Sequence, residues 1–424
     1  SPGETVQIPV TVFSLEDGRK SVAVSVKTND GLKLVGPTTK TIEFSKSGDE
    51  TVYFLAEVAE KVGVATLEAT AKEGNEKDSK AIEIAIRTPN PKVTDVTDLV
   101  VQAGETLSSS VILEGLNGTN NCAIEVSALP PLNLHSRVDQ LLQYPHGCVE
   151  QTTSSVFAQL FLNDVITLTE SQLFKADENV QAAIRRLQLF QNSTGGLGYW
   201  PGANESSPWG TNYAGHFLVL AQQKGYKVDR DFMKDWLSYQ QKEAKNFSNS
   251  RYDDDLIQAY RLYTLVLAGK PDLASMNRMR ETANLNPTVK WRLAAAYAKA
   301  GMPEVATSLV NDLEIVAQHY INGHGYTFGS SLRDKAMILE TLGLLGEELR
   351  YADLMKEVAK QLSSKSWLST QETAYSLIAM AGIYKQNKGN GELHFDFTRS
   401  GHTTQVKTGK ALFQKELILN ASRK

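Results

Sequence analysis

The residue pair in this sequence best suited to chemistry is a cysteine followed three residues later by a glutamine. Cys148 and Gln151 lie in the stretch YPHGCVEQTTSS, residues 144–155. The Pro-x-Gly before the cysteine predicts a turn, and the hydroxyl residues 152–154 are typical of a helix start. Cys148 is therefore expected at or just before a helix N-terminus, where the helix dipole favours a thiolate over a thiol.

A spacing of three allows both side chains to lie on the same side of one helical turn. A thiolate that faces a carboxamide carbon can displace ammonia, which leaves an internal thioester between the Cys148 sulfur and the Gln151 acyl carbon. Correct orientation is worth roughly 7–11 kcal/mol in such intramolecular reactions, so the local geometry itself can drive closure. The alternative that the spacing leaves open is a buried cysteine that merely caps a helix.

The first ninety residues carry apolar side chains at every second position, for example at residues 6–12, 22–26 and 82–86. Turn sequences separate these runs, and the combination predicts an antiparallel β-sandwich over residues 1–90. The prolines in the sequence TPNP, residues 88–91, interrupt any strand there, so we expect a domain boundary. Strand-like segments continue over residues 91–134.

Residues 135–387 follow the helical period instead, with apolar residues at i, i+3, i+4 and i+7. We expect helices at 149–169, 176–191, 211–224, 253–268, 288–299, 303–318, 332–345, 351–362 and 370–384. Aromatic loops precede several of them, and a repeat of about 40 residues predicts six helical hairpins closed into an α/α toroid. Residues 388–424 return to a strand pattern. The toroid is thus expected as an insertion in a small β domain whose two halves, 91–134 and 388–424, pair with each other.

The composition excludes several classes of protein. The 424 residues carry 44 basic and 48 acidic side chains, a net charge of −4, so no nucleic-acid partner is expected. Apolar runs are shorter than the roughly 18 residues that a membrane helix needs. Two cysteines do not make a disulfide framework. The chain begins at Ser1-Pro2 without a methionine, and we expect it to be a fragment of a longer protein.

The whole string around Cys148 resembles the thioester signature of the α-macroglobulin and complement superfamily, most closely the bacterial alpha-2-macroglobulin family. The resemblance covers most of the chain and includes the loop GGLGYWP at 195–201, the stretch 256–271 and TQETAY at 370–375. It implies that the helical block is a thioester domain, an α/α toroid. It also implies that this domain is inserted in a CUB domain and that a macroglobulin-like β-sandwich precedes it.

The resemblance also assigns the site. Cys148 and Gln151 would form the thioester, and Tyr144, Gly147 and Glu150 would shield or support it. Tyr144 in particular would exclude water, because an exposed acyl group hydrolyses. Three further aromatic residues are candidates for the shield, although packing within the toroid is expected for them: Tyr199, Trp200 and Trp209.

Complement relatives use a histidine downstream of the cysteine to pass the acyl group to hydroxyls. This chain has no histidine between His216 and His319, so direct transfer to amines is expected. His146 is expected to be a turn residue that points to solvent, and His216 and His324 to be structural.

By the same resemblance, the chain is part of a broad-spectrum protease-trapping inhibitor with a single-use thioester, and it is not an enzyme. Its targets would be proteases, captured through lysine amines, with a peptidoglycan-synthesising penicillin-binding protein as a further partner. The full-length protein would be periplasmic or attached to the cell envelope by a lipid anchor. No cofactor and no metal are expected, since the run Asp253-Asp254-Asp255 lacks the spacing of a calcium loop.

Three other functions remain open from the residues alone. A toroid glycosidase or terpene-cyclase relative has Glu205, Asp253 and Glu372 available, but no spacing singles out a pair of carboxylates. A cysteine hydrolase would pair Cys148 with a histidine such as His324. A binding or scaffold module would carry an inactive site. The mass of the chain separates these, because an intact thioester makes it one ammonia lighter.

Overall fold

The structure is a computed structural model. It describes residues 1–18, 20–90, 93–111, 115, 119–127, 130, 138, 141–166, 168–248, 252–315, 327–364, 367–386, 393–409 and 412–417. The chain divides into two compact units, Ser1–Ile124 with Glu416–Lys424, and Glu125–Lys415. Among the described helices, none combines the length and the apolar character needed to cross a membrane.

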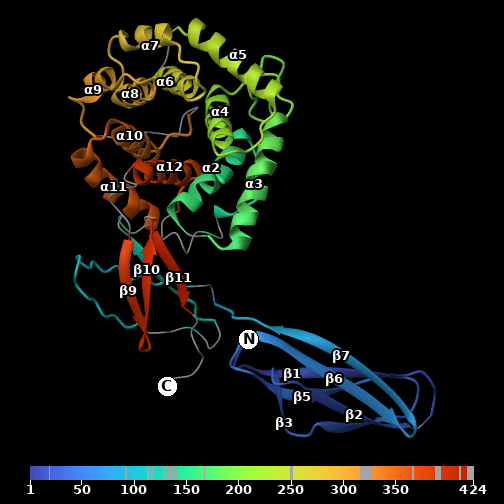
Figure 1. The fold of residues 1–424 in the computed structure, drawn as a ribbon. Coiled ribbons are helices and arrows are strands. Elements are labelled where there is room, and N and C mark those ends of the chain that lie inside the picture. Colours follow the sequence, from blue (N-terminus) through green and yellow to red (C-terminus); the bar gives the residue numbers. More distant parts are fainter. Residues whose placement is uncertain are drawn as a thin grey trace. The chain divides into compact units, whose positions relative to one another are not determined.

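The first unit contains an antiparallel β-sandwich (Figure 1). Its strands are β1 (Thr5–Ser14), β2 (Lys20–Thr28), β3 (Leu32–Val35), β4 (Thr39–Phe44), β5 (Gly48–Val58), β6 (Gly63–Glu73) and β7 (Glu76–Ile86). One sheet has the order β1-β5-β3 and the other β4-β2-β6-β7. Val22, Val24 and Val26 of β2 are buried between the sheets, as their alternation in the sequence predicts.

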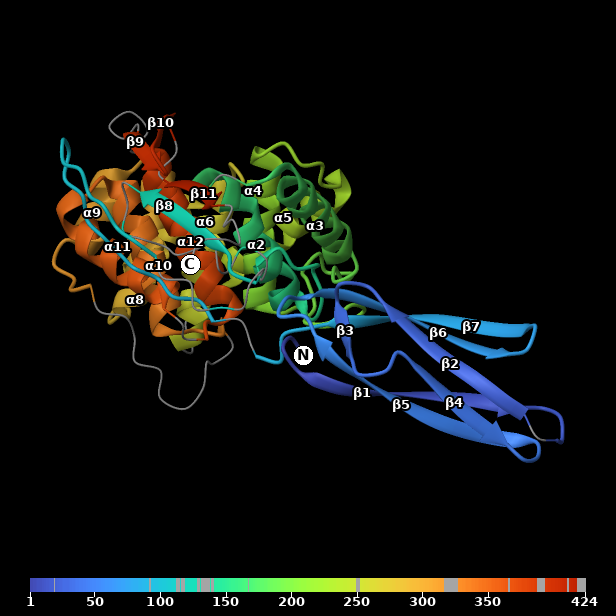
Figure 2. The same cartoon turned by 90° about the horizontal axis from the view of Figure 1, so that it is seen from below.

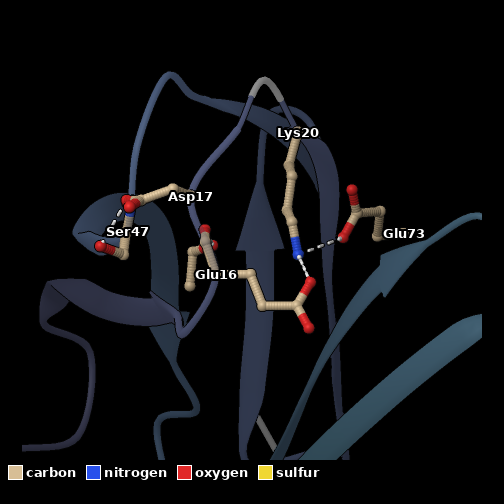
Figure 3. A network of polar contacts seen from close by, with 6 residues as sticks. Glu16, Asp17, Lys20, Ser47 and Glu73 are labelled. Carbon is tan, nitrogen blue, oxygen red and sulfur yellow. Dashed lines mark hydrogen bonds and ion pairs between the residues drawn. The ribbon is translucent and has the colours of Figure 1, made fainter.

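Polar contacts join the loops at one end of this sandwich (Figure 3). Asp17 accepts hydrogen bonds from the backbone N–H and the hydroxyl of Ser47, at 2.8 and 2.7 Å. The Lys20 ammonium lies 3.0 Å from Glu16 and 3.9 Å from Glu73. Exposed ion pairs of this kind contribute little to stability, so the sandwich depends on its apolar core.

The second unit is mainly helical (Figures 1 and 2). Its helices are α2 (Val149–Val165), α3 (Glu170–Gln188), α4 (Pro208–Gln223), α5 (Arg230–Asn246), α6 (Tyr252–Leu267), α7 (Leu273–Arg280), α8 (Pro287–Lys299), α9 (Pro303–Val310), α10 (Ser331–Leu345), α11 (Glu348–Ser363) and α12 (Thr370–Gln386). The even-numbered helices pack one against the next, and α12 packs back against α2. The odd-numbered helices lie outside this ring. The predicted α/α toroid is therefore confirmed.

Two of these outer helices, α5 and α7, have no counterpart among the helices expected from the sequence. In α5 one face is buried, and charged residues make up much of the remainder; the buried residues are Phe232, Trp236, Tyr239, Gln240 and Ala244. The helix expected at 303–318 corresponds to α9, which ends at Val310, and residues 316–326 lie outside the described part. α7 has only 8 residues, and the apolar residues of α5 are separated by many polar ones, so neither shows a long apolar period.

Buried aromatic and charged side chains fill the inside of the ring. Arg292 of α8 forms a 2.6 Å ion pair with Glu340 of α10, and the Tyr263 hydroxyl donates to the same carboxylate at 2.7 Å. The Arg292 guanidinium lies 3.9 Å from the centre of the Tyr263 ring. Tyr213 and Tyr375 stack with their ring centroids 5.4 Å apart. These contacts hold the inner helices together.

Short strands lie on both sides of the helical block in the sequence. β8 (Cys122–Ser127) and β11 (Leu412–Leu417) are neighbours in a two-stranded sheet, while β9 (Leu393–Arg399) and β10 (His402–Thr408) form an antiparallel hairpin. The pairing of β8 with β11 agrees with the expected pairing of the flanks. The strand pattern of the sequence predicts strands at 392–398 and 410–419, and β10 is additional to these two. The CUB-like assignment and the four domain boundaries stay predictions.

Candidate thioester site

Cys148 and Gln151 are joined by a reciprocal pair of hydrogen bonds at the start of α2. Cys148 is the N-cap residue, with an extended backbone at φ −72° and ψ 175°. Its sulfur accepts a hydrogen bond from the Gln151 backbone N–H at 3.5 Å, and its own N–H donates to Gln151 Oε1 at 3.3 Å. This is a capping box in which cysteine replaces the usual serine or threonine. The predicted position of Cys148 at the helix start is confirmed.

Gly147 makes room for the glutamine side chain. Its φ of +83° lies in the left-handed region that favours glycine. A Cβ atom at this position would lie 2.1 Å from Gln151 Oε1 and 3.0 Å from Gln151 Cδ. Only glycine therefore permits both the turn and the folded-back carboxamide.

Two side chains hold the turn that precedes Cys148. The Thr152 hydroxyl donates to the His146 carbonyl oxygen at 3.2 Å. Arg186 of α3 donates from Nη2 to the Gly147 carbonyl oxygen at 2.9 Å and from Nε to the Thr152 hydroxyl at 3.2 Å. The sequence pattern around the cysteine gives no indication of Arg186, because it lies on another helix.

Tyr199, from the loop between α3 and α4, is the aromatic residue that contacts the cysteine. Its carbonyl oxygen accepts a hydrogen bond from the Val149 N–H at 3.1 Å. Hydrogen bonding with Cys148, burial and the charges of Cys148 and Glu150 raise the pKa of Tyr199 to about 12. Tyr199 also packs against Trp200 and Phe328, as expected of toroid packing, and its part in a shield stays a prediction.

The other predicted aromatic residues lie differently. Tyr144 is 66% exposed, and its shielding role stays a prediction. Trp209 is buried beneath the Arg333 guanidinium, as expected of toroid packing. Trp200 is half exposed and meets the Tyr199 ring edge to face.

Glu150 connects the site with the last inner helix. It is buried, and its Oε1 accepts hydrogen bonds from the Ser154 hydroxyl at 2.7 Å and from the Thr370 hydroxyl at 3.1 Å. The Ser154 hydroxyl in turn lies 3.0 Å from the Tyr213 hydroxyl inside the ring. Glu150 thus supports the start of α2 through contacts with α12.

The histidines do not supply a partner for Cys148 among the described residues. His146 is exposed, with Nδ1 2.9 Å from the Tyr144 carbonyl oxygen, as expected of a turn residue. His216 is buried, and its Nδ1 lies 2.9 Å from the Tyr260 hydroxyl. Burial lowers the pKa of His216 to about 3, so the ring is neutral. His324 lies outside the described residues.

The carboxylates considered for glycosidase chemistry do not form a described pair. Glu372 accepts a hydrogen bond from the Ser369 N–H at 2.7 Å and so caps α12. Glu205 is exposed in the loop before α4, and the Asp253 side chain lies outside what the structure describes. Within the described residues, no group of three or more His, Cys, Asp and Glu side chains is arranged to hold a metal.

This arrangement suits an acyl transfer between the two side chains. Cys148 is buried, at 2% exposure, whereas the Gln151 side chain is exposed to solvent. The N–H of Cys148 points at the oxygen on which negative charge develops when the carboxamide carbon is attacked.

Known proteins match the chain in sequence and in fold. The family model described as "A-macroglobulin TED domain" matches residues 123–255. Alpha-2-macroglobulin of Escherichia coli is 25% identical over 416 residues, which are 90% of this chain and 24% of the relative. That of Xylella fastidiosa strain Temecula1 is 23% identical over 420 residues, 92% of this chain and 25% of the relative.

Two solved structures have the same fold. Native E. coli alpha-2-macroglobulin, from domain MG7 to the C-terminus, aligns with a TM-score of 0.58 and 19% identity, over 98% of this chain and 68% of that chain. Salmonella alpha-2-macroglobulin reacted with methylamine aligns with a TM-score of 0.55 and 20% identity. The alignment covers 98% of this chain and 28% of the Salmonella chain.

Fold and site together define a protein with a macroglobulin TED domain. Over most of its length the chain is similar to bacterial alpha-2-macroglobulins. It spans about a quarter of the length of the curated relatives that match over most of it.

Proposed function

We propose that Cys148 and Gln151 form an internal thioester, and that the whole protein uses it once to capture an attacking protease. The observation that carries this proposal is the reciprocal capping box, in which each of the two side chains bonds the backbone N–H of the other residue. A cysteine that merely caps a helix needs only the bond from the Gln151 N–H to its sulfur. The second bond brings the acceptor carbonyl to the nucleophile.

Closure is balanced without a co-reactant. The bond between Sγ of Cys148 and Cδ of Gln151 forms, and the bond between Cδ and Nε2 breaks. The thiol proton leaves with the amide nitrogen as ammonia. The N–H of Cys148 stabilises the charge on Oε1 during the attack, and the helix start stabilises the thiolate before it.

Opening by an amine forms an amide and releases the thiol. The amine nitrogen bonds to Cδ, the carbon–sulfur bond breaks, and a proton from the amine ends on the sulfur. A lysine of a protease would remain attached to Gln151 by a stable amide, which is why the site acts once and does not turn over. The Salmonella relative that was reacted with methylamine supports amines as the reactive class.

Mass spectrometry of the chain tests the proposal. The expected result is a mass one ammonia below that of the sequence, which methylamine raises while it frees one thiol. Cys148→Ser is the matched control, because serine keeps the helix cap but should leave the full mass. A full mass for the unmodified chain, with no methylamine uptake, would contradict the thioester and leave the scaffold module as the function.

The proposal extends to the setting of the whole protein. We place its action at the periplasm or cell envelope, with a lipid anchor on the full-length chain and a penicillin-binding protein as a neighbour. These assignments depend on the family resemblance alone. Fractionation of cells that express the full-length protein, followed by cross-linking, tests both.

A further inference from the structure

The helices α2 and α12 pack side by side and begin with the same kind of cap (Figure 1). At the start of α12, the Ser369 hydroxyl accepts a hydrogen bond from the Glu372 N–H at 3.2 Å, and Glu372 Oε2 accepts one from the Ser369 N–H at 2.7 Å. These reciprocal bonds make a second capping box, which fixes the position of Thr370 as the first residue of α12. The Thr370 hydroxyl donates to Glu150 Oε1 at 3.1 Å. One carboxylate therefore connects the two helix starts.

The same carboxylate oxygen receives a second connection from α12. The Ser154 hydroxyl donates to Glu150 Oε1 at 2.7 Å, and the Tyr213 hydroxyl lies 3.0 Å from the Ser154 oxygen. Since Ser154 uses its proton on Glu150, the proton in the second bond comes from Tyr213. The Tyr213 ring stacks on Tyr375 of α12, with centroids 5.4 Å apart and planes 17° from parallel. α12 thus reaches Glu150 directly through Thr370 and indirectly through its stacked tyrosine.

Burial makes these hydrogen bonds important for the shape of the turn. Glu150 is 7% exposed and Tyr213 is fully buried, so water cannot readily replace a donor that is lost there. Thr370 is exposed, so its hydroxyl can be removed without opening the core. Glu150 lies between Cys148 and Gln151, inside the turn that both bonds of their capping box span. Contacts that hold Glu150 therefore hold that turn.

We propose that Thr370 and Tyr213 are positioning residues for thioester formation, and that their connections to Glu150 make this reaction depend on the docking of α12 against α2. The inference rests on the thioester proposed above. Neither residue takes part in the bond changes, in which Sγ of Cys148 bonds to Cδ of Gln151 and ammonia leaves with the thiol proton. With Glu150 held, the first turn of α2 keeps the carboxamide at the sulfur. A displacement of about 1 Å at a reacting centre can cost a hundredfold in rate, so a small movement of this turn is enough.

The first test measures, by mass spectrometry, the ratio of chains that are one ammonia light to chains of full mass. Thr370→Val removes the hydroxyl that donates to Glu150, and this ratio should fall about tenfold. Thr370→Ser keeps the hydroxyl and should restore the ratio. Thr373→Val is the matched control, because the Thr373 hydroxyl donates to the Ser369 carbonyl oxygen within the same segment, at 3.2 Å. Equal ratios in Thr370→Val and Thr373→Val would overturn the proposal.

The second test does not need an intact thioester, and all its chains carry Cys148→Ser, which keeps the helix cap. The N–H groups of Gln151 and Thr152 bond to residue 148 in the first turn of α2. Hydrogen–deuterium exchange at these two N–H groups therefore reports how often the turn opens. Thr370→Val should raise this exchange rate about tenfold, and Thr373→Val should leave it unchanged.

Two further variants separate the two connections. Tyr213→Phe keeps the stacked ring but removes the hydroxyl, and it should also raise the exchange rate at the start of α2. In a Glu150→Ala background, Thr370→Val should have no further effect, because its acceptor is gone. An unchanged rate in Thr370→Val or Tyr213→Phe, or the same rise without Glu150, would overturn the proposal. A full mass in every chain of the first test would instead contradict the thioester itself, so the two failures are distinguishable.

Discussion

Arg186 of α3 donates a hydrogen bond from Nη2 to the carbonyl oxygen of Gly147 at 2.9 Å. Its Nε donates to the Thr152 hydroxyl, which itself donates to the His146 carbonyl oxygen. One guanidinium thus connects the turn before Cys148 with the first turn of α2. The turn has left-handed backbone at Gly147, so a bond to that carbonyl opposes its rotation.

We expect Arg186→Met to lower the fraction of chains that carry the thioester and to lower the free energy of unfolding of the helical unit by about 2 kcal/mol. The reason is the loss of two charged hydrogen bonds to the turn. Arg186→Lys should restore little of the lost thioester content or stability. A lysine ammonium lacks the planar guanidinium whose nitrogens donate to two acceptors at once. Arg185→Met, one position away and exposed, is the control. Intact mass and urea denaturation measure the two effects, and equal thioester content in all variants would contradict this role.

Gly147→Ala should abolish thioester formation. The added Cβ would lie 2.1 Å from Gln151 Oε1, so the carboxamide has to leave the capping box. Gly202→Ala is a control with almost the same backbone, φ +76°, but with no atom within 4 Å of the added Cβ. Both variants should lose about 1 kcal/mol of stability from the left-handed backbone. Only Gly147→Ala should have the full mass, and a lighter mass there would contradict the geometry.

The contrast between Cys148 and Tyr199 explains what the sequence can predict here. The Cys148–Gln151 pair lies within one turn, so its hydrogen bonds follow from local spacing. Tyr199 and Arg186 reach the same point from α3 and the loop after it, and that meeting depends on how the helices pack. The toroid was predictable because its inner helices are apolar over long stretches. β10 exposes most of its side chains, and α5 has few apolar residues among many polar ones, so their apolar patterns were too sparse to predict them.

Acid should destabilise the helical unit through His216. The unfolded chain binds a proton with a pKa of about 6.5, whereas burial lowers the pKa of folded His216 to about 3. Between these values the unfolded state holds more protons, so stability falls as pH falls, by about 2 kcal/mol from pH 6.5 to pH 5. Burial alone would raise the pKa of Glu340, but the Arg292 charge outweighs burial and lowers this pKa from its usual 4.5, below the interval from pH 6.5 to pH 5.

His216→Gln should remove this part of the pH dependence. The free energy of unfolding is measured by urea denaturation at pH 5 and pH 7, with tryptophan fluorescence as the signal. All five tryptophans, at 200, 209, 236, 291 and 367, belong to the helical unit, so the signal reports that unit alone. The same pH dependence in the variant and the unmodified chain would show that His216 is not the group responsible.

The thioester should react with amines in preference to alcohols. An alcohol has to lose its proton as it attacks, and a neutral amine does not, so the alcohol needs a general base. His216 is buried and bonded to Tyr260, and the sequence has no histidine from 217 to 318. Methylamine should therefore label the chain well ahead of glycerol at matched concentration. Equal labelling that disappears in His146→Ala would identify His146 as the base.

The contact between Glu150 and Thr370 has a consequence for the timing of biosynthesis. These residues are 220 positions apart, and their bond belongs to the packing of α12 on α2 that closes the ring. At about 5–20 residues per second, the ribosome makes Thr370 some 10–45 seconds after Glu150. Throughout that interval the start of α2 lacks its support from α12. The complete set of contacts around the proposed thioester is therefore a late product of folding.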